Sequence, residues 1–284
     1  MNRLTLLLAI TMAAMSLPSM AETNFPSRLS DRGRKAYAEK YEPASQNKAF
    51  AITRDGQKFY WVHSLPSSER AARTASLRCL TAHGVPCVVW MVNNEETLSL
   101  YDKAVGESEE AVALLPAELQ KKAFGGEDND LKVSTPSTLR DGAVIHSATP
   151  VEAPTGTRII STSDLVGLYR TQPGLVVLDS LHDSAVKKQT LPKAAWLHGA
   201  GWSQPEQNSA IDANLAKAMA VLAPSKDTPV VSYCLSWECW LSWNAAMRLA
   251  AMGYTQVYWY RGGIESWKAA RLPVVETPIT AQLW

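Results

Sequence analysis

The sequence predicts an α/β protein: a parallel sheet with helices on both faces, preceded by a smaller α+β unit. Beyond residue 157, short apolar runs such as 175–179 and 229–233 alternate with segments of helical pattern. Strands that are apolar on both faces are typical of a parallel sheet covered by helices. Before residue 124, the patterns instead follow the order strand, strand, helix, strand. The two parts therefore differ in architecture.

The composition fits a folded protein with an ordinary surface. Of the 284 residues, 46% are hydrophobic and only 19% are charged, which supports one large buried core or two average ones. The 28 Lys and Arg residues nearly balance the 27 Asp and Glu residues, giving a formal charge of +1. Because the chain has no basic excess, we expect neither nucleic acid nor an anionic membrane surface as a partner.

Residues 1–21 have the pattern of an export signal. Arg3 is followed by an apolar run at 4–15, and the small residues Ser19 and Ala21 fit a signal-peptidase site. The run is too short to cross a bilayer comfortably. We expect cleavage after Ala21 and a bacterial periplasmic location, with no membrane attachment afterwards. A retained signal anchor is the alternative.

The first unit, residues 22–124, is predicted to be a small α+β domain. Its expected elements are strands at 48–53 and 59–63, a helix from Ser67 to Gly84, and a strand at 87–92. Asp55 and Gly56 mark the turn between the first two strands. Residues 125–156 are predicted to be a linker, because turn-forming residues cluster there without a hydrophobic period.

Four cysteines stand in two near pairs, Cys79 with Cys87 and Cys234 with Cys239. In an oxidising compartment an even count favours disulfides, and one pair in each unit is the simplest of three possible connectivities. A Cys79–Cys87 bond would join the helix end to the next strand and stabilise the fold by about 2–3 kcal/mol. A redox role for this pair would need a nearby positive field, which the sequence does not suggest.

The first unit resembles small exported bacterial modules that are clipped by a disulfide. The shared positions are Ala49 to Ile52, Gly56, Trp61, Ala71, Leu77, Cys79, Cys87 and Asn93. This resemblance implies no particular chemistry for the unit.

The second unit, residues 157–284, alternates predicted strands and helices. The strands are expected at 158–160, 175–179, 195–197, 229–233 and 257–260, and the helices at 165–169, 212–222, 241–252 and near Trp267. In open parallel sheets the functional residues gather beyond the carboxyl ends of the strands. Cys234 has such a position, because it directly follows a central strand and precedes a loop and a helix.

Cys234 is therefore the candidate nucleophile. The unpaired N–H groups at the start of the following helix would favour a thiolate or a bound anion. Such a field lowers the pKa of a cysteine thiol. The alternatives are an inert buried cysteine at a strand end, or one half of a structural disulfide.

Residues 157–275 resemble a rhodanese domain. The resemblance rests on 175–179, 191–197, 230–234 and, most specifically, 253–267 with the Leu272-Pro273-Val274 that follows. The loop with Cys234, Cys239 and Trp240 is similar to the cysteine–loop–cysteine–tryptophan (CXXCW-type) motif of an exported subgroup. That subgroup is associated with PQQ-dependent, quinoprotein alcohol oxidation. The resemblance implies a rhodanese-like parallel sheet with helices on both faces.

The resemblance also implies sulfur transfer. Cys234 would attack a small sulfane-sulfur donor, become a persulfide and pass the sulfur to a thiophilic acceptor such as a thiol. Backbone N–H groups of the loop would hold the anion. The loop residues are Leu235, Ser236, Trp237, Glu238, Cys239 and Trp240. Asp179, at the end of the neighbouring strand, would orient the loop, or alternatively would bond only to a local turn; no cofactor is implied.

Three departures from the family pattern bear on this expectation. The loop has no cation and carries Glu238, whose charge raises the pKa of a nearby thiol and repels anionic donors. His182 stands near the place where an arginine often follows the strand-end aspartate. The loop is also longer than usual. The related phosphatases need an arginine six residues after the cysteine, where Trp240 stands, so phosphate-ester hydrolysis is not expected.

Cys239 opens a second chemistry, because it could resolve an oxidised or sulfur-loaded Cys234 as a disulfide. A structural loop disulfide is the simpler alternative, and two thiolates could also bind copper or zinc. His182 and His198 are single and separated in the sequence, so no metal is expected. The second functional candidate is thus a thiol–disulfide or docking module that serves a thiol reductant or a periplasmic quinoprotein dehydrogenase. The third is a non-catalytic binding domain.

Tryptophans concentrate around the cysteine loop. Trp243, Trp259 and Trp267 are expected in the core, beneath the helix and against the sheet. Trp237 and Trp240 are expected at the surface or in a pocket, where they could form an apolar platform for a partner or an aromatic ligand.

Overall fold

The computed structural model describes residues 29–183, 185–279 and 281–283. The predicted signal segment, residues 1–21, lies outside these ranges. Within them, no helix is both long enough and apolar enough to span a bilayer.

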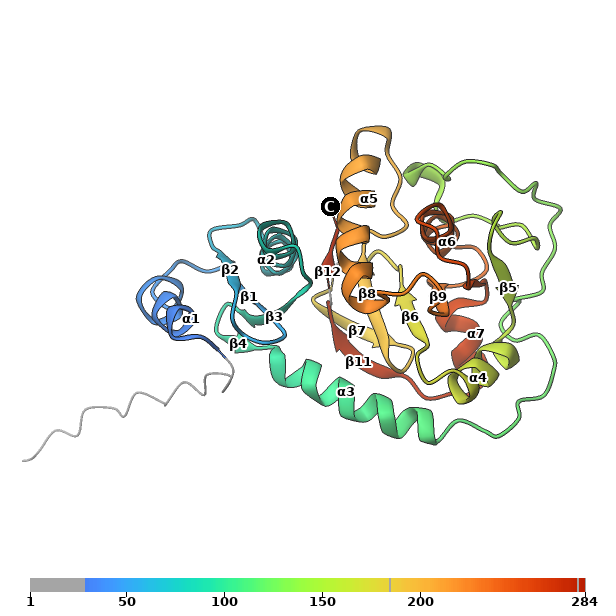
Figure 1. The fold of residues 1–284 in the computed structure, drawn as a ribbon, viewed down its shortest axis with the longest axis horizontal. Coiled ribbons are helices and arrows are strands. Elements are labelled where there is room, and N and C mark those ends of the chain that lie inside the picture. Colours follow the sequence, from blue (N-terminus) through green and yellow to red (C-terminus); the bar gives the residue numbers. More distant parts are fainter. Residues whose placement is uncertain (1–28, 184, 280, 284) are drawn as a thin grey trace, which may run out of the picture.

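The first unit is built on an antiparallel sheet with the strand order β2-β1-β3-β4 (Figure 1). The elements are α1 (Asp31–Ala36) with a π-helical turn (Tyr37–Tyr41), β1 (Ala49–Thr53), β2 (Phe59–Val62), α2 (Ser68–His83), β3 (Cys87–Val92) and β4 (Glu95–Glu96). The predicted order of strand, strand, helix and strand is present, with α1 and β4 in addition.

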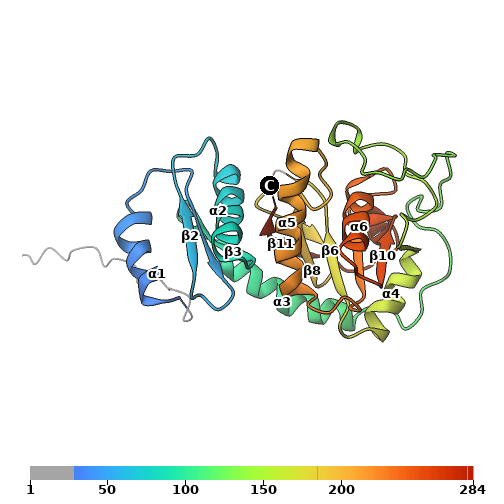
Figure 2. The same cartoon turned by 45° about the horizontal axis from the view of Figure 1, so that its top comes forward.

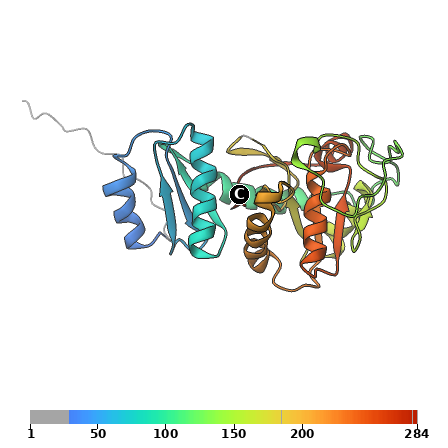
Figure 3. The same cartoon turned by 90° about the horizontal axis from the view of Figure 1, so that it is seen from above.

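Both faces of this sheet are covered. Alternate residues of β1 point to opposite sides, so Ala49 and Ala51 pack against α2, whereas Phe50 and Ile52 pack against α1 and the π-helical turn. Figure 3 shows the sheet between the two helices. The small residues on one side of β1 let α2 approach closely.

α2 has clear start and stop signals. Ser67 caps the first turn by accepting a hydrogen bond from Arg70 N (3.2 Å), and Gly84 ends the helix in the left-handed conformation at φ +72°. Cys79, near the helix end, forms a disulfide with Cys87 at the start of β3. The predicted pairing is confirmed, and both cysteines are buried.

α3 (Leu98–Ala113) belongs to both units. It begins beside β3 and then runs along β11 (Val275–Pro278), as Figure 1 shows. Ser108 Oγ of this helix accepts a hydrogen bond from Lys193 N (2.9 Å), and Glu109 forms an ion pair with Lys193 Nζ (2.8 Å). A segment assigned to the first unit by sequence thus also packs on the second.

The second unit contains the predicted parallel sheet. Its strands lie in the order β12-β8-β6-β9-β10-β5, and each neighbouring pair is parallel. They are β5 (Arg158–Ile160), β6 (Val176–Asp179), β8 (Ala194–His198), β9 (Val230–Tyr233), β10 (Val257–Tyr260) and β12 (Ala281–Gln282). A separate antiparallel pair, β7 (Lys187–Thr190) with β11, was not expected, because its polar sequence lacks an apolar strand pattern.

Helices cover both faces of the parallel sheet (Figure 2). They are α4 (Thr162–Thr171), α5 (Pro205–Leu222), α6 (Leu241–Ala251) and α7 (Gly263–Ala269). Leu215 of α5 and Trp243 of α6 share one apolar cluster with the sheet. Leu165 of α4 and Trp267 of α7 belong to another. This arrangement confirms the predicted α/β fold class.

Local signals explain where two of these helices begin. Ser161 and Asp164 form a reciprocal capping box at the start of α4. α5 starts at Pro205, earlier than the predicted start at 212, because proline is favoured in the first helical turn. The prediction missed this turn, which precedes the buried residue Ile211 and is mostly polar.

The strand β12 joins the two units. It extends the parallel sheet beside β8, and Gln282 N donates a hydrogen bond to Ser76 Oγ of α2 (3.1 Å). Trp196 of β8 and Ile279 enter the apolar cluster formed by α2 and the first sheet. The two units therefore share a buried interface.

The predicted linker, residues 125–156, contains only one short regular element among its residues, a 3-10 turn at Gly142–Val144. It passes around the side of the second unit that faces away from the first (Figure 1). Although irregular, it is held against the sheet, because buried Arg261 donates hydrogen bonds to the carbonyls of Glu127, Asn129 and Thr149.

Candidate active site at the carboxyl end of β9

The loop with the two cysteines lies at the carboxyl end of the central strand β9. Tyr233 ends β9, Cys234 follows it, and α6 begins at Leu241. Cys234 and Cys239 form a disulfide across the loop, with their Cα atoms 6.3 Å apart. The pairing that the sequence favoured for the second unit is thus present in the structure.

Cys234 is enclosed by protein. The residue is 1% exposed and shares an apolar cluster with Ile145 and Leu241. Its Sγ lies 3.1 Å from the carbonyl oxygen of Cys239 and 3.1 Å from Ser242 Oγ. The sequence predicts a reachable thiolate, whereas the structure holds a buried disulfide, because residues of the predicted linker pack over it.

The predicted anion cradle is not formed in this oxidised state. Glu238 N donates to Ser236 Oγ (3.3 Å), and Cys239 N donates to Ser236 O (3.1 Å). Trp240 N donates to Ile145 O (2.9 Å). Three of the loop N–H groups therefore already have acceptors inside the protein, and the loop would have to change conformation to bind an anion.

The other side chains of the loop lie in different surroundings. Leu235 is half-buried against the cysteine cluster, and Ser236 is buried. Trp237 is half-buried, with the guanidinium of Arg261 5.4 Å from its ring centre. Glu238 is exposed, so solvent and salt screen the charge that was expected to oppose a thiolate.

The tryptophans are mostly internal. Trp243, Trp259 and Trp267 are fully buried, as predicted. Trp240 is 1% exposed, so the prediction of a surface or pocket position for it is wrong. Its ring packs edge-on against Trp243 (5.5 Å between centres), and its Nε1 donates to Ser147 Oγ of the predicted linker (2.9 Å).

Asp179 is buried at the end of β6. Its carboxylate forms an ion pair with Lys188, accepts a hydrogen bond from Tyr233 Oη (2.7 Å) and accepts another from Leu181 N (2.9 Å). None of these partners belongs to the loop at 235–240. The local-turn interaction considered from the sequence is present, and the loop-orienting contact is not.

Residues 140–149, which we call the cover, close the loop from outside. Ile145 O accepts the N–H of Trp240, and His146 forms an isolated antiparallel bridge with Cys239. Thr149 Oγ1 donates to Trp237 O (2.5 Å). This segment could not be recognised from the sequence, because it has no hydrophobic period.

A histidine pair also lies at this edge of the sheet. The rings of His182 and His198 are 4.4 Å apart between centres, although the two residues are separated in the sequence. His182 follows β6 and His198 ends β8, and these two strands are neighbours in the sheet. Burial, reinforced by the nearby charges of His182, Arg73 and Lys188, lowers the pKa of His198 to about 2.

A cation of the first unit reaches the histidine pair. Arg73 of α2 donates to Asp183 O (2.9 Å), in the segment that follows β6. Burial and the charge of Arg73 both lower the pKa of His182, against a smaller opposing effect of Asp183. Within the described ranges, no group of three His, Cys, Asp or Glu residues is arranged to hold a metal ion.

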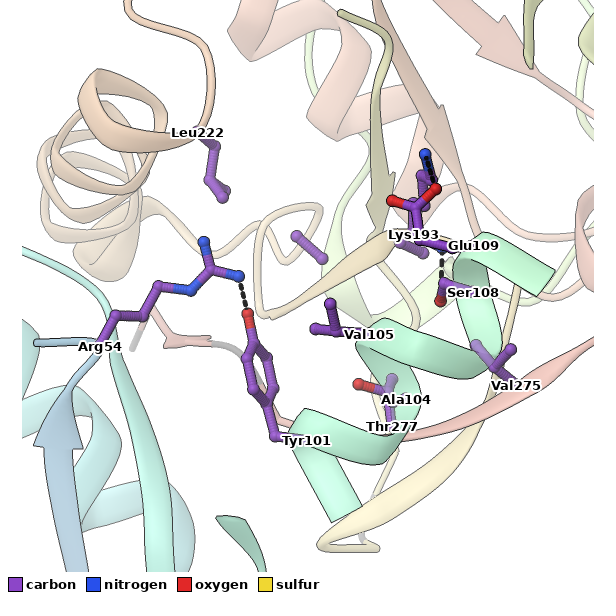
Figure 4. A pocket seen from close by; sticks show the side chains of 12 residues that line it. Arg54, Tyr101, Ala104, Val105, Ser108, Glu109, Lys193, Leu222, Val275 and Thr277 are labelled. Carbon is purple, nitrogen blue, oxygen red and sulfur yellow. Dashed lines mark hydrogen bonds and ion pairs between the residues drawn. The ribbon is translucent and has the colours of Figure 1, made fainter. Parts of the chain in front are cut away.

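The cavities lie away from the cysteines. One of about 210 Å³ opens between Arg54 of the first unit, Tyr101 of α3 and Lys193 before β8 (Figure 4). This cavity lies at the amino end of β8, whereas the cysteine loop lies at the carboxyl end of β9. Another, of about 710 Å³, lies between the start of the cover and the helices α5 and α6, with Arg248 in its wall. The cysteines line neither.

Comparisons with known proteins agree with the architecture of the second unit. The family model described as "Rhodanese-like domain" matches residues 163–270, the part that holds α4, α5, α6 and most of the parallel sheet. The chain thus contains a rhodanese-like domain behind a first unit that this match does not cover.

Among solved structures, a thiosulfate sulfurtransferase from Pseudomonas aeruginosa is similar at 18% sequence identity and a TM-score of 0.33. The similarity covers 45% of this chain and 22% of that protein, so the chain spans about a fifth of its length. This likeness is too distant to bear on activity. No protein of the curated collection matches.

Proposed function

We propose that the chain is a periplasmic sulfurtransferase of the rhodanese type, whose nucleophile Cys234 is stored as a disulfide with Cys239. The observation that carries the proposal is the position of Cys234, directly after β9 and before the start of α6. In open parallel sheets this edge holds the reacting groups, and the helix start favours an anionic sulfur.

The proposed cycle starts with a reduction. Two thiols, or one dithiol, give two electrons and two protons to the Cys234–Cys239 bond and leave as a disulfide. The Cys234 thiolate then attacks the outer sulfur of a sulfane donor such as thiosulfate, and the sulfur–sulfur bond of the donor breaks. Sulfite leaves, and Cys234 carries a persulfide. A thiol acceptor takes the outer sulfur as its own persulfide and regenerates the thiolate.

Cys239 and Asp179 are expected to have roles other than that of the nucleophile. Cys239 would release a stalled persulfide by attacking the inner sulfur of Cys234, which expels hydrosulfide and restores the resting disulfide. Asp179, held by Lys188 and Tyr233, would fix the end of β9 next to Cys234 rather than touch the donor. The backbone of the loop 235–240 would bind the donor only after rearrangement.

A second candidate function is thiol–disulfide exchange, in which the cysteine pair passes two electrons between protein partners. The specific observation in its favour is the loop itself: it supplies a paired Cys239 and no cation for an anionic donor. The partner could be a thiol reductant or, as the subgroup resemblance suggests, a periplasmic quinoprotein dehydrogenase.

Mass spectrometry of the intact protein distinguishes these functions. The protein is reduced with dithiothreitol, freed of reductant and incubated with thiosulfate. The gain of one sulfur atom by the Cys239→Ser variant, but not by Cys234→Ser, supports sulfur transfer. No gain in any form, together with rapid reversible oxidation by a dithiol–disulfide partner, would favour electron exchange and reject the sulfurtransferase proposal.

A further inference from the structure

We propose that the cover, residues 140–149, is a gate coupled to the Cys234–Cys239 bond, and that Arg261 is the positioning residue that fastens it. The gate would be closed while the disulfide is intact and would loosen on reduction. The proposal rests on the proposed function only in taking Cys234 as the reactive group. The gate would control how reagents reach Cys234.

The cover contacts the cysteine loop from Ile145 onward, whereas Arg140 at its start exchanges two hydrogen bonds with Asn244 of α6 (2.7 and 2.8 Å). Ile145 O accepts the N–H of Trp240 (2.9 Å), and Ser147 Oγ accepts the indole N–H of the same residue (2.9 Å). His146 bridges to the backbone of Cys239. The side chain of Ile145 is buried in the cluster around Cys234. The cover thus holds the residues on which the geometry of the disulfide depends.

The far end of the cover is held at the other side of the loop. Thr149 N and Thr149 Oγ1 both donate to Trp237 O, at 3.2 and 2.5 Å. Arg261 Nε donates to Thr149 Oγ1 (3.0 Å), and its Nη2 donates to Thr149 O (2.8 Å). One guanidinium therefore fixes the residue that bonds the loop, and its Cζ lies 5.4 Å from the centre of the Trp237 ring.

Arg261 is built for this role. It is 1% exposed, and its remaining donors go to Glu127 O (2.7 Å) and Asn129 O (2.8 Å). It follows β10 directly, so it stands on the rigid sheet rather than on the loop. A planar, forked donor set can serve several carbonyls at once, which the ammonium group of lysine does not reproduce.

Apart from these bonds and those of Arg140 and Gly142 at its start, the cover has few attachments; Gly142 N donates to Ser203 O (2.8 Å). Only the short turn at Gly142–Val144 is regular, and Val144 is 42% exposed. Segments with few buried apolar contacts open locally at a low cost in free energy. Opening would break the bonds to Trp237, Cys239 and Trp240, together with those between Arg140 and Asn244, and would uncover Cys234 without disturbing the sheet.

Coupling between the cover and the disulfide must act in both directions. If the intact bond holds Cys239 where His146 can pair with it, reduction weakens the docking of the cover. By the same factor, a loosened cover makes the bond easier to reduce. The redox step itself transfers two electrons and two protons from a dithiol to the two sulfurs, and the dithiol becomes a disulfide.

The first arm of the test measures how fast dithiothreitol reduces the Cys234–Cys239 bond, by quenching with an alkylating reagent and mass mapping. The variants are Thr149→Ala, Ser147→Ala and Arg261→Lys. The matched controls are Thr171→Ala, a hydroxyl that bonds only within α4, and the exposed Arg170→Lys. Each of these three variants should raise the reduction rate about tenfold, the change expected from one lost hydrogen bond. The controls should leave the rate unchanged.

The second arm measures tryptic cleavage after Arg140, which lies in the cover and stacks on the Trp240 ring at 5.1 Å. Cleavage there should be several-fold faster in the reduced wild-type protein than in the oxidised protein, while cleavage after exposed Lys121 stays constant. If Arg261→Lys does not fold by circular dichroism, the two hydroxyl variants still decide the outcome.

Equal reduction rates in cover variants, controls and wild type would overturn the gate, as would cleavage after Arg140 that ignores the redox state. Neither arm contains a sulfane donor. A protein that never forms a persulfide can therefore still support the gate, and a protein that transfers sulfur can still lack it.

Discussion

The hydroxyl of Tyr233, the last residue of β9, donates a hydrogen bond of 2.7 Å to the carboxylate of Asp179, the last residue of β6. The same hydroxyl accepts a hydrogen bond from Leu191 N (3.0 Å), and Asp179 also pairs with buried Lys188. Burial and the adjacent carboxylate raise the pKa of Tyr233 well above its ordinary value, so the tyrosine stays a donor. The residue before Cys234 is thereby fixed from the neighbouring strand.

Replacing Asp179 with Asn should destabilise the protein. The amide keeps the shape but leaves the ammonium of Lys188, which is nearly buried, without its anion. Loss of one partner of a buried ion pair costs about 3–5 kcal/mol. Urea unfolding measures this change. Glu276→Gln, which removes the exposed ion pair to Lys187, is the control and should cost less than about 1 kcal/mol. Equal losses in the two variants would contradict the prediction.

His198 should make stability fall in acid. Its folded pKa of about 2 lies below the ordinary value near 6.5, so the unfolded chain binds a proton first as the pH drops. Stability is therefore lost as the pH falls from roughly 6.5 towards 2, by about 1.4 kcal/mol per pH unit for this one group. Above pH 6.5 the group contributes no pH dependence.

The check is urea unfolding of wild type and His198→Gln at several values between pH 7 and pH 4. The variant should show a flatter dependence, whereas His63→Gln, at an exposed residue, should follow the wild type. Parallel curves for wild type and His198→Gln would show that this histidine is not the group responsible.

The Cys79–Cys87 disulfide should act on stability and not on sulfur chemistry. The bond closes a loop with a sequence separation of 8 and lies in the apolar cluster of the first unit. In the chain-entropy model its removal costs about 2.5 kcal/mol. The double variant Cys79→Ala, Cys87→Ala should unfold at lower denaturant concentration, while the reduction rate of Cys234–Cys239 stays the same. A changed reduction rate would indicate that the two pairs exchange.

Gly201 should be intolerant of a side chain. A Cβ atom at this position would lie 1.8 Å from Leu241 O, at the start of α6. The helix that follows the cysteine loop would have to move, so Gly201→Ala should destabilise the protein by more than about 2 kcal/mol, a cost in the range of strained core substitutions. Gly167→Ala in α4 is the control. Its Cβ would meet nothing within 4 Å, and alanine favours helices, so stability should rise slightly. Thermal unfolding of both variants decides the matter.

The sequence predicted those features that leave a local pattern. The parallel strands are continuous apolar runs, α2 is bounded by Ser67 and Gly84, and Cys234 stands at a strand end; each of these positions follows from near neighbours in the chain. The burial of Cys234 and Trp240 could not be predicted in the same way, because the residues that enclose them come from an irregular segment about 90 residues earlier.

One signal for the cover was nevertheless present. Arg261 follows an apolar strand and precedes two glycines, where a free cation would be costly to bury. A guanidinium in such a place needs several acceptors, and irregular backbone with unpaired carbonyls is the usual source. The predicted linker supplies that backbone, through the carbonyls of Glu127, Asn129 and Thr149. The meeting of His182 and His198 left no comparable sign, since it depends only on which strands are neighbours.

The shared helix α3 has a mechanical consequence. The helix α3 starts beside the first sheet and is fixed to the second unit by the contacts of Ser108 and Glu109 with Lys193. The strand β12 makes a second link, through the hydrogen bond from Gln282 N to Ser76 Oγ. Because the two units are joined at two places, we expect no hinge motion between them. A partner that binds the first unit would therefore act directly on the parallel sheet that carries Cys234.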